Sequence, residues 1–149
     1  MKKIPLFIIS ILFVSMIFCG CERGDFEIKD GTYRAEFSDY DVQGYKDYVE
    51  ITFEDEAVTS IEADAVSEHG GTLKSEAAEF KNDMQLICGT YPEKYYKDLI
   101  NQYLDNPESD NIDIVAGATW TSNDFIALVR ALEKAVREGN TDTVIVKRK

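Results

Sequence analysis

The chain has 149 residues with 28 acidic and 16 basic side chains, which gives a formal net charge of −12 at pH 7. This length suits one domain built around one hydrophobic core. Because a strongly negative surface repels phosphate groups, the charge balance disfavours nucleic acid and anionic membranes, and it favours cationic partners or simple solubility. We therefore expect no nucleic-acid partner.

The first 21 residues have the pattern of a lipoprotein signal peptide. Lys2 and Lys3 precede an apolar run that ends in Cys19-Gly20-Cys21. The run of about 15 residues is shorter than the roughly 20 that a membrane-spanning helix needs, and its order of charge, apolar run and small residue is typical of a secretory signal. Gly20 before Cys21 resembles a lipobox, which predicts cleavage before Cys21 and acylation of that cysteine. An ordinary signal peptide and an uncleaved N-terminal anchor are the alternatives.

Removal of this segment leaves a mature chain of net charge −14, because Lys2 and Lys3 are lost and no acid is lost. Residues 22–30 are polar and without clear periodicity, and we interpret them as a tether. Residues 31–149 then form the folded domain. Its single thiol, Cys88, cannot form an internal disulfide, and we predict it to be a buried apolar filler.

Three strand patterns follow the tether, at 32–37, 45–53 and 58–66, and their short connections predict a half-buried antiparallel meander. Apolar and polar residues alternate along each of them, as they do in a strand with one buried face. The residues predicted to face the core are Tyr33, Ala35, Phe37, Tyr45, Val49, Ile51, Phe53, Ile61, Ala63 and Ala65.

The apolar spacing then changes to steps of three and four, which predicts helices over 73–87, 92–105 and 122–137. Thr72 is the expected cap of the first helix. Thr121 with Asp124 resembles a capping box at the start of the third.

Residues 143–146 fit a last short strand. Strands followed by helices predict an α+β fold: a single domain with an antiparallel sheet of three or more strands packed against about three helices.

The segment 113–122, Asp-Ile-Val-Ala-Gly-Ala-Thr-Trp-Thr-Ser, carries the candidate chemistry. Small residues at Gly117 and Ala118 allow a ligand to approach the backbone. The hydroxyl of Thr119 precedes a helix, and a helix start offers unpaired N–H groups and a positive dipole end that favour a phosphate. Trp120 is placed to stack on a flat ring. From the residues alone, an ordinary turn and helix cap is the competing interpretation.

This segment resembles the flavinylation motif of the FMN-binding domain family. That domain occurs in the C subunit of the sodium-pumping NADH:quinone oxidoreductase, in the G subunit of the Rnf complex and in small membrane-anchored lipoproteins. In the family, the threonine of Ser/Thr-Gly-Ala-Thr is joined to the FMN phosphate by a phosphoester bond, which a separate Mg-dependent flavin transferase makes. The resemblance extends over roughly residues 30–139.

The family roles are carried over by position. Thr119 matches the attachment site, which is a modification site rather than a catalytic nucleophile, and Gly117 and Ala118 match the small residues before it. Asp113 matches the upstream acid, while Ala116 stands where the family usually has Ser or Thr. The remaining motif positions, taken as further cofactor-binding candidates, are Trp120, Thr121 and Ser122.

Weaker candidates lie before the first predicted helix. His69 and Gly70 fall in a loop where larger relatives carry a flavin-proximal stretch, although the default for His69 is an exposed loop residue. Lys74 either places a positive charge near the flavin or is a solvated lysine. The tyrosines Tyr91, Tyr95 and Tyr96 either flank a ring or belong to the core and its rim. The sequence shows no His/Cys cluster with metal-ligand spacing.

The resemblance implies an extracytoplasmic flavoprotein, lipid-anchored to the cell membrane through Cys21, that carries FMN for electron transfer rather than acting as a stand-alone enzyme. Its implied partners are the flavin transferase and a membrane electron donor or quinone. A surface lipoprotein that binds a partner without flavin is one alternative. A module that binds FMN without a covalent bond is another.

Overall fold

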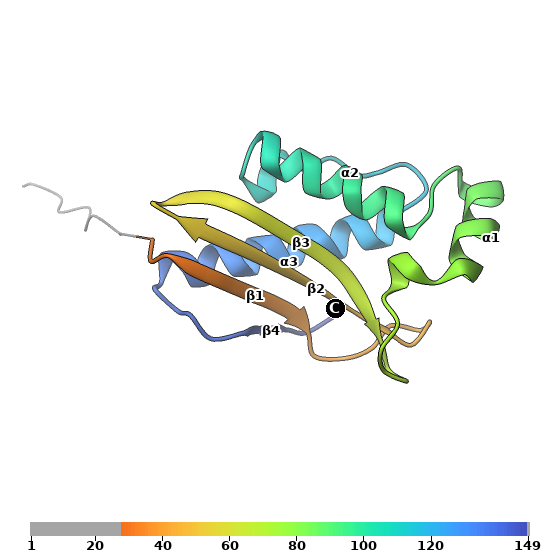
Figure 1. Ribbon diagram of the computed structural model, residues 1–149, viewed down its shortest axis with the longest axis horizontal. Coiled ribbons are helices and arrows are strands. Elements are labelled where there is room, and N and C mark those ends of the chain that lie inside the picture. The colour runs from red at the N-terminus through yellow and green to blue at the C-terminus, as the bar shows by residue number, and fades with distance from the viewer. Residues whose placement is uncertain (1–27, 149) are drawn as a thin grey trace, which may run out of the picture.

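The computed structural model describes residues 28–148, so the predicted signal peptide and most of the predicted tether lie outside the described residues. The elements in chain order are β1 (Gly31–Phe37), β2 (Tyr45–Glu54), β3 (Ala57–Ser67), the short 3-10 turn η1 (Lys74–Glu76), α1 (Ala78–Cys88), α2 (Pro92–Asp105), the 3-10 turn η2 (Ser109–Asn111), α3 (Thr119–Arg137) and β4 (Val144–Val146) (Figure 1).

The four strands form one sheet in the order β3-β2-β1-β4. The predicted meander is confirmed, since β1 pairs antiparallel with β2, and β2 pairs antiparallel with β3. Val49 lies opposite Ala35 on one side and Ala63 on the other, which places three predicted core residues on one face. The predicted last strand is present as well, but it pairs parallel with β1, which makes the sheet mixed.

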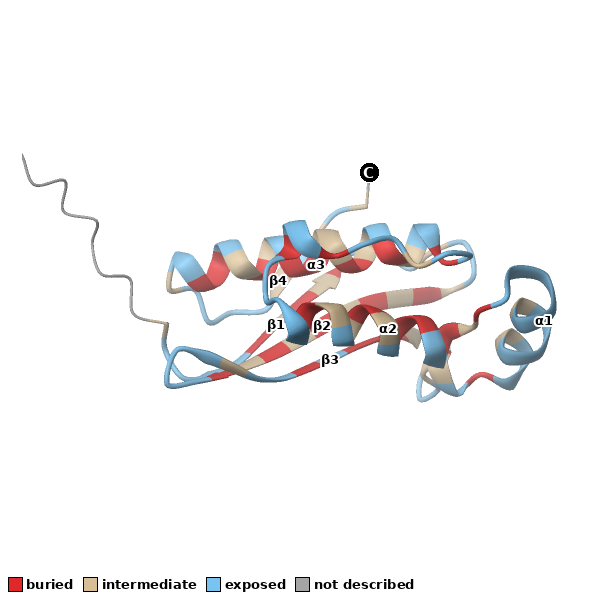
Figure 2. Cartoon of the chain, turned by 90° about the horizontal axis from the view of Figure 1, so that it is seen from above, coloured by how far each residue is buried: buried red, intermediate tan, exposed pale blue. Residues whose placement is uncertain are grey.

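Helices α2 and α3 cover one face of the sheet, and their buried residues alternate with exposed ones along each helix (Figure 2). All ten residues that the strand patterns predicted to face inward are buried. Leu99 of α2 and Leu128 and Leu132 of α3 are fully buried against them. Burial of such side chains contributes about 1.5–3 kcal/mol each, so this layer holds the fold together. The predicted α+β single domain is confirmed.

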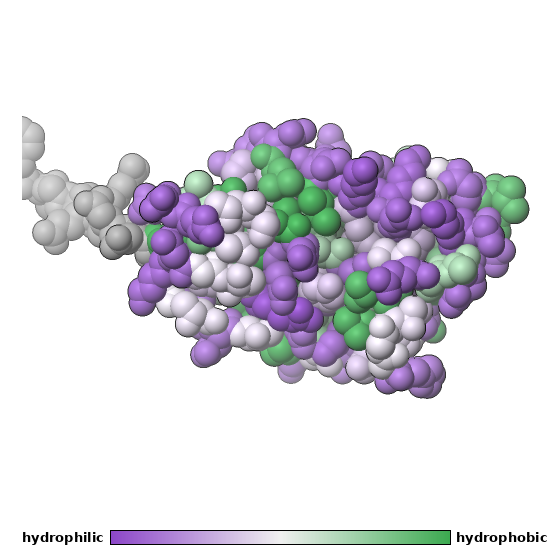
Figure 3. Space-filling model, viewed as in Figure 1, coloured by the Kyte–Doolittle hydropathy of each residue, from purple (hydrophilic) through white to green (hydrophobic). Residues whose placement is uncertain are grey.

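The other face of the sheet is polar, and hydrophilic residues predominate on it in Figure 3. Arg34 of β1 forms ion pairs with Glu36 at 2.9 Å and with Glu50 at 2.7 Å. Lys46 pairs with Glu36 at 2.8 Å. A face of this kind is stable in water, so the sheet needs a helical layer on one side only.

The first predicted helix is partly wrong. Residues 74–76 form a 3-10 turn, Leu73 makes an isolated bridge to Val66, and α1 begins only at Ala78. No residue of α1 is buried, and Ile87 is 82% exposed. The reason is position, because α1 lies beyond the end of the two-layer body (Figure 1). Phe80 packs edge-on against Tyr45 and Met84 packs against the core, but Ile87 remains exposed.

Two local predictions are also wrong. Helix α3 begins at Thr119, so Thr121 lies inside its first turn and does not cap it. The cap residue is Ala118, which makes no side-chain cap hydrogen bond. Cys88 is exposed at the end of α1 instead of buried, because it shares the uncovered position of that helix. Within residues 28–148, no helix is both long enough and apolar enough to cross a bilayer.

Candidate functional site

A cavity of about 480 Å³ lies where the β1–β2 loop, η1, α1, the start of α3 and the C-terminal segment meet. Its volume is within the range of small-molecule sites in proteins. Six of the predicted site residues line it: Lys74, Gly117, Ala118, Thr119, Trp120 and Thr121. The fold therefore brings the end of the motif and the predicted lysine to one place.

The loop before α3 is fixed by Gly117. Its φ is +81°, a left-handed conformation that glycine adopts without steric cost. A Cβ atom at this position would lie 2.5 Å from the carbonyl oxygen of Cys88 and 3.1 Å from Cγ2 of Thr90. The loop is therefore pressed against the connection between α1 and α2, and a glycine is required at this contact.

Ser122 holds the same loop from the other side. Its side chain is fully buried, and its hydroxyl accepts a hydrogen bond from the backbone N–H of Val115 at 3.1 Å. The hydroxyl also donates to the carbonyl of Ala118 at 2.8 Å. Ser122 does not line the cavity, so its contact is with the backbone that presents Thr119.

Thr119 is the first residue of α3 and is exposed at the cavity. The first backbone N–H groups of a helix have no partner within it, and Ala118 supplies no side-chain cap here. The positive end of the helix dipole also lies at this point. The hydroxyl of Thr119 therefore stands beside free donors and a favourable field for a phosphate.

Two cations line the cavity, the buried Lys74 and the partly buried Arg148, and both are already paired with carboxylates. Lys74 is 5% exposed, and its Nζ lies 3.1 Å from Oδ2 of Asp41. This burial excludes the solvated-lysine alternative. Arg148 pairs with Asp47 at 2.7 Å and also with Asp124.

The surroundings shift the pKa values of two of these carboxyl groups in opposite directions. Burial raises the pKa of Asp124 above its ordinary value, and the charge of Arg148 offsets only part of this. Burial also acts to raise the pKa of Asp41, but the backbone N–H of Tyr45 and the charge of Lys74 outweigh it, so that pKa lies below its ordinary value. Of these two acids in the cavity wall, Asp124 is therefore harder to ionise than an ordinary aspartate and Asp41 is easier to ionise.

Two buried side-chain polar atoms in the described part of the chain have no hydrogen-bond partner, Oγ1 of Thr90 and Nε of Arg148. Thr90 packs against Gly117, and Arg148 lines the cavity. Unsatisfied buried polar atoms are rare in folded proteins and call for an explanation. One of the two atoms therefore lies in the cavity wall, and the other lies behind the lining residue Gly117.

The other predicted site residues lie outside the cavity lining. His69 and Gly70 are in the exposed loop after β3, and the His69 side chain is 88% exposed. Asp113 is exposed, and its backbone N–H donates to Oε1 of Gln102 at 2.7 Å. Ala116 is exposed one residue before Gly117.

Tyr95, one of the tyrosines considered as neighbours of a ring, lines the cavity but is only 1% exposed. Several lining residues were not named as candidates: Tyr40, Asp41, Val42, Gln43, Asp47, Met84, Asp124 and Arg148. Asp47 was detectable, because it stands at an inward position between Tyr45 and Val49 of β2, where an acid needs a buried partner. The β1–β2 loop carries no pattern of this kind.

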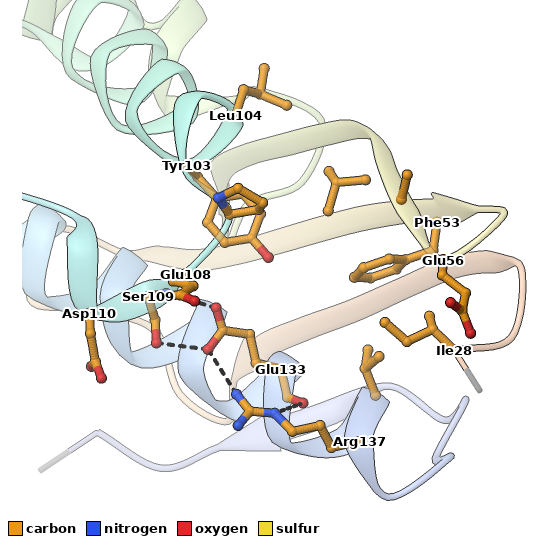
Figure 4. A pocket seen from close by; sticks show the side chains of 14 residues that line it. Ile28, Phe53, Glu56, Tyr103, Leu104, Glu108, Ser109, Asp110, Glu133 and Arg137 are labelled. Carbon is orange, nitrogen blue, oxygen red and sulfur yellow. Dashed lines mark hydrogen bonds and ion pairs between the residues drawn. The ribbon is translucent and has the colours of Figure 1, made fainter. Parts of the chain in front are cut away.

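A larger hollow of about 710 Å³ lies at the opposite end of α3 (Figure 4). Glu133 accepts hydrogen bonds there from the backbone N–H of Ser109 at 2.7 Å and from its hydroxyl at 2.8 Å, and it pairs with Arg137. Because these polar groups satisfy one another and no motif residue is present, we assign the site to the smaller cavity. Within residues 28–148 there is no cluster of three His, Cys, Asp or Glu side chains that could hold a metal.

Fold, motif and cavity agree with the comparisons to known proteins. Residues 44–134 match the model of the FMN-binding domain, and the chain belongs to that family. It is 34% identical over 118 residues to the 15 kDa lipoprotein of Treponema pallidum (strain Nichols), an alignment that covers 79% of this chain and 83% of that protein.

Two solved structures are also similar to this fold. A Clostridium perfringens protein of known crystal structure is 28% identical with a TM-score of 0.77, and the match covers 83% of this chain and 100% of that one. A Clostridium thermocellum protein solved by NMR is 22% identical with a TM-score of 0.50, covering 71% of this chain and 90% of that one, and it supports the fold alone.

Proposed function

We propose that this chain carries FMN, joined through its phosphate to Oγ of Thr119, and that it transfers electrons outside the cytoplasm. The observation that carries the proposal is the position of Thr119. Its hydroxyl is exposed, lies at the first residue of α3 and opens onto the cavity that the family motif helps to form. A phosphate there meets the unpaired N–H groups of the helix start.

The residues around the cavity fit an FMN group in kind. The helix start and the buried cation Lys74 suit the phosphate, and Gly117 lines the cavity beside them. Trp120, which is 87% exposed, offers aromatic surface to a flat ring. FMN when bound supplies the redox chemistry, whereas the protein supplies attachment, orientation and electrostatics.

The bond to Thr119 is a phosphoester, formed with the net loss of one water, and a separate Mg-dependent flavin transferase is its proposed source. Covalent attachment suits a protein outside the cytoplasm, because a dissociated cofactor would be diluted away. The similar Treponema pallidum protein is named a lipoprotein. This name and the Gly20-Cys21 pair support the proposed lipid anchor at Cys21 on the extracytoplasmic side of the cell membrane.

The test compares two threonines in the first turn of α3. The full chain is coexpressed with a flavin transferase as wild type, Thr119→Ala and Thr121→Ala, and flavin fluorescence is read in a denaturing gel. We expect a fluorescent band for wild type and Thr121→Ala, and none for Thr119→Ala. A fluorescent Thr119→Ala band contradicts the attachment site. Colour that denaturant releases from the wild type indicates non-covalent FMN, and a colourless wild type favours a binding module without flavin.

A further inference from the structure

The anchored end and the cavity end of the domain are opposite ends of α3. Ile28, the first described residue after the tether, lines the same hollow as Val136 and Arg137 at the end of the helix. Thr119 at its start lines the cavity. Since α3 has 19 residues, these ends are separated by about 27 Å along the helix axis. Figure 1 shows the same arrangement, with the start of β1 at the end of the domain opposite α1.

The tether is too short for the cavity end of the domain to face the bilayer. Cys21 lies seven residues before Ile28, so the segment between them spans at most about 25 Å when fully extended. The next residue is held to the domain, because the hydroxyl of Tyr33 donates to the carbonyl of Lys29 at 2.8 Å. Pressing the cavity end against the bilayer would hold Ile28 about 27 Å above it, beyond the full reach of the tether.

The rim of the cavity has the composition of a protein-docking surface. Val42 and Trp120 are more than 85% exposed, and Tyr40 is 44% exposed. Exposed apolar and aromatic side chains gathered at one place mark interaction sites, and Tyr and Trp are enriched in protein interfaces. We call these three residues the rim.

Charge defines the kind of partner. Exposed Asp39 and Asp83 stand next to Tyr40 and Met84 in the sequence, at this end of the molecule. The cations Lys74 and Arg148 are already paired with carboxylates within the domain. The mature chain as a whole has a net charge of −14. Such a surface attracts a basic protein and is repelled by anionic lipid.

We propose that the rim faces away from the bilayer and docks a basic one-electron carrier protein, and that this protein, rather than a quinone within the membrane, exchanges electrons with the domain. The electron exchange rests on the proposed flavin, and the orientation rests on the proposed lipid anchor at Cys21, whereas the docking rests on neither. In the exchange, two oxidised carriers each take one electron from FMNH2, which returns to FMN and releases two protons to water.

The orientation can be tested without flavin, because Trp120 is the sole tryptophan of the chain. The full acylated Thr119→Ala chain is placed in phosphatidylcholine vesicles that contain brominated lipid, which quenches nearby tryptophan. We expect Trp120 emission to match that in vesicles without bromine. The control carries Trp120→Phe with Leu104→Trp, which moves the tryptophan to the end near Ile28, and we expect it to be quenched. Quenching of Trp120 as strong as in the control would overturn the orientation.

Docking is tested on the same vesicles with cytochrome c, a basic haem carrier whose haem quenches tryptophan at short range. We expect saturable quenching of Trp120 at low salt. Asp39→Lys with Asp83→Lys should weaken the binding at least about 10-fold, since reversed charges at the interface oppose association. Reversal of two exposed acids near the other end, Glu54→Lys with Asp105→Lys, should change it less than about 2-fold. Equal effects of the two pairs would refute the docking surface.

A third experiment distinguishes failure of this inference from failure of the proposed function. In the flavin-loaded wild type, vesicles containing quinone should oxidise the reduced flavin much more slowly than added cytochrome c does. Oxidation by bilayer quinone at an equal rate would contradict the protein partner. Absence of covalent flavin in the gel would contradict the proposed function, while the Trp120 measurements would still decide the orientation and the docking.

Discussion

A Cβ atom on Gly117 would lie 2.5 Å from the carbonyl oxygen of Cys88, a distance that packed atoms do not tolerate. The contact joins the loop before α3 to the connection between α1 and α2. Because Ser122 ties the same loop to α3, the backbone around Thr119 is held from both sides. The acceptor hydroxyl is thus presented by a constrained segment, as a modification site needs to be.

Gly117→Ala should lower the free energy of unfolding by about 2–4 kcal/mol, since it adds the cost of a positive φ to a clash with backbone. The matched control is Gly70→Ala. Its φ of +82° is nearly the same, but nothing lies within 4 Å of the added atom. Urea unfolding of both variants checks this, and equal losses would show that the Cys88 contact contributes nothing.

Arg148→Met should destabilise the fold by about 3 kcal/mol, because it leaves the carboxylates of Asp47 and Asp124 without their cation. Asp47 is only 5% exposed, so water cannot replace the lost partner well. Arg130→Met removes an exposed pair with Asp110 and should cost less than about 1 kcal/mol. The account predicts this ranking in urea unfolding, and the reverse ranking would contradict it.

Glu36 provides a prediction of pH dependence away from the cavity. Burial acts to raise its pKa, but Lys46 and Arg34 outweigh it, so the pKa lies below the ordinary value of 4.5. A lowered pKa in the folded state means that the ionised carboxylate stabilises the fold above pH 4.5, and that this stabilisation is lost as the pH falls through the folded pKa.

Thermal unfolding midpoints of wild type and Glu36→Gln should therefore differ by a constant amount above that pH, with the wild type more stable. The difference should shrink under more acidic conditions. A difference that stays constant or grows on acidification would show that the ion pairs on the open sheet face do not act as described.

Leu99 and Ile87 are both apolar helix residues, but Leu99 is buried and Ile87 is exposed, so their substitutions should differ in cost. Leu99→Ala should cost about 2–5 kcal/mol, because the side chain is fully buried between α2 and the sheet. Ile87→Ser should change the free energy of unfolding by less than about 0.5 kcal/mol, because Ile87 is 82% exposed. A large loss from Ile87→Ser would mean that α1 packs against something in solution.

Much of the fold follows from local pattern. Period-two alternation identified ten buried apolar strand residues, because a sheet with one covered face imposes that spacing, but it missed the buried Asp47 of β2. The apolar side of α1 has the same kind of signal as α2, yet Ile87 is exposed and Leu99 is buried. Periodicity shows that a helix has an apolar face, but only the tertiary arrangement decides whether another element covers it. The direction of β4 is likewise set by the return path of α3.

The part of the candidate site that lies within one sequence motif could be predicted, whereas the residues that the fold brings together from distant segments could not. The motif placed Thr119 at a helix start, and the structure moves that start onto Thr119 itself. Asp41 and Arg148 could not be found from the sequence, because they are 107 residues apart and meet the motif only through the sheet. Lys74 was identified, but its burial depends on Asp41 from the β1–β2 loop.

The attachment of FMN to Thr119 is tested most directly by mass spectrometry. The full chain is coexpressed with a flavin transferase, the intact mass of the exported protein is measured, and fragmentation locates any modification. The account predicts a gain of one FMN minus one water, with the added mass on the peptide that contains Thr119 and on that residue. An unmodified Thr119 in the exported protein, with no bound flavin beside it, would contradict the account.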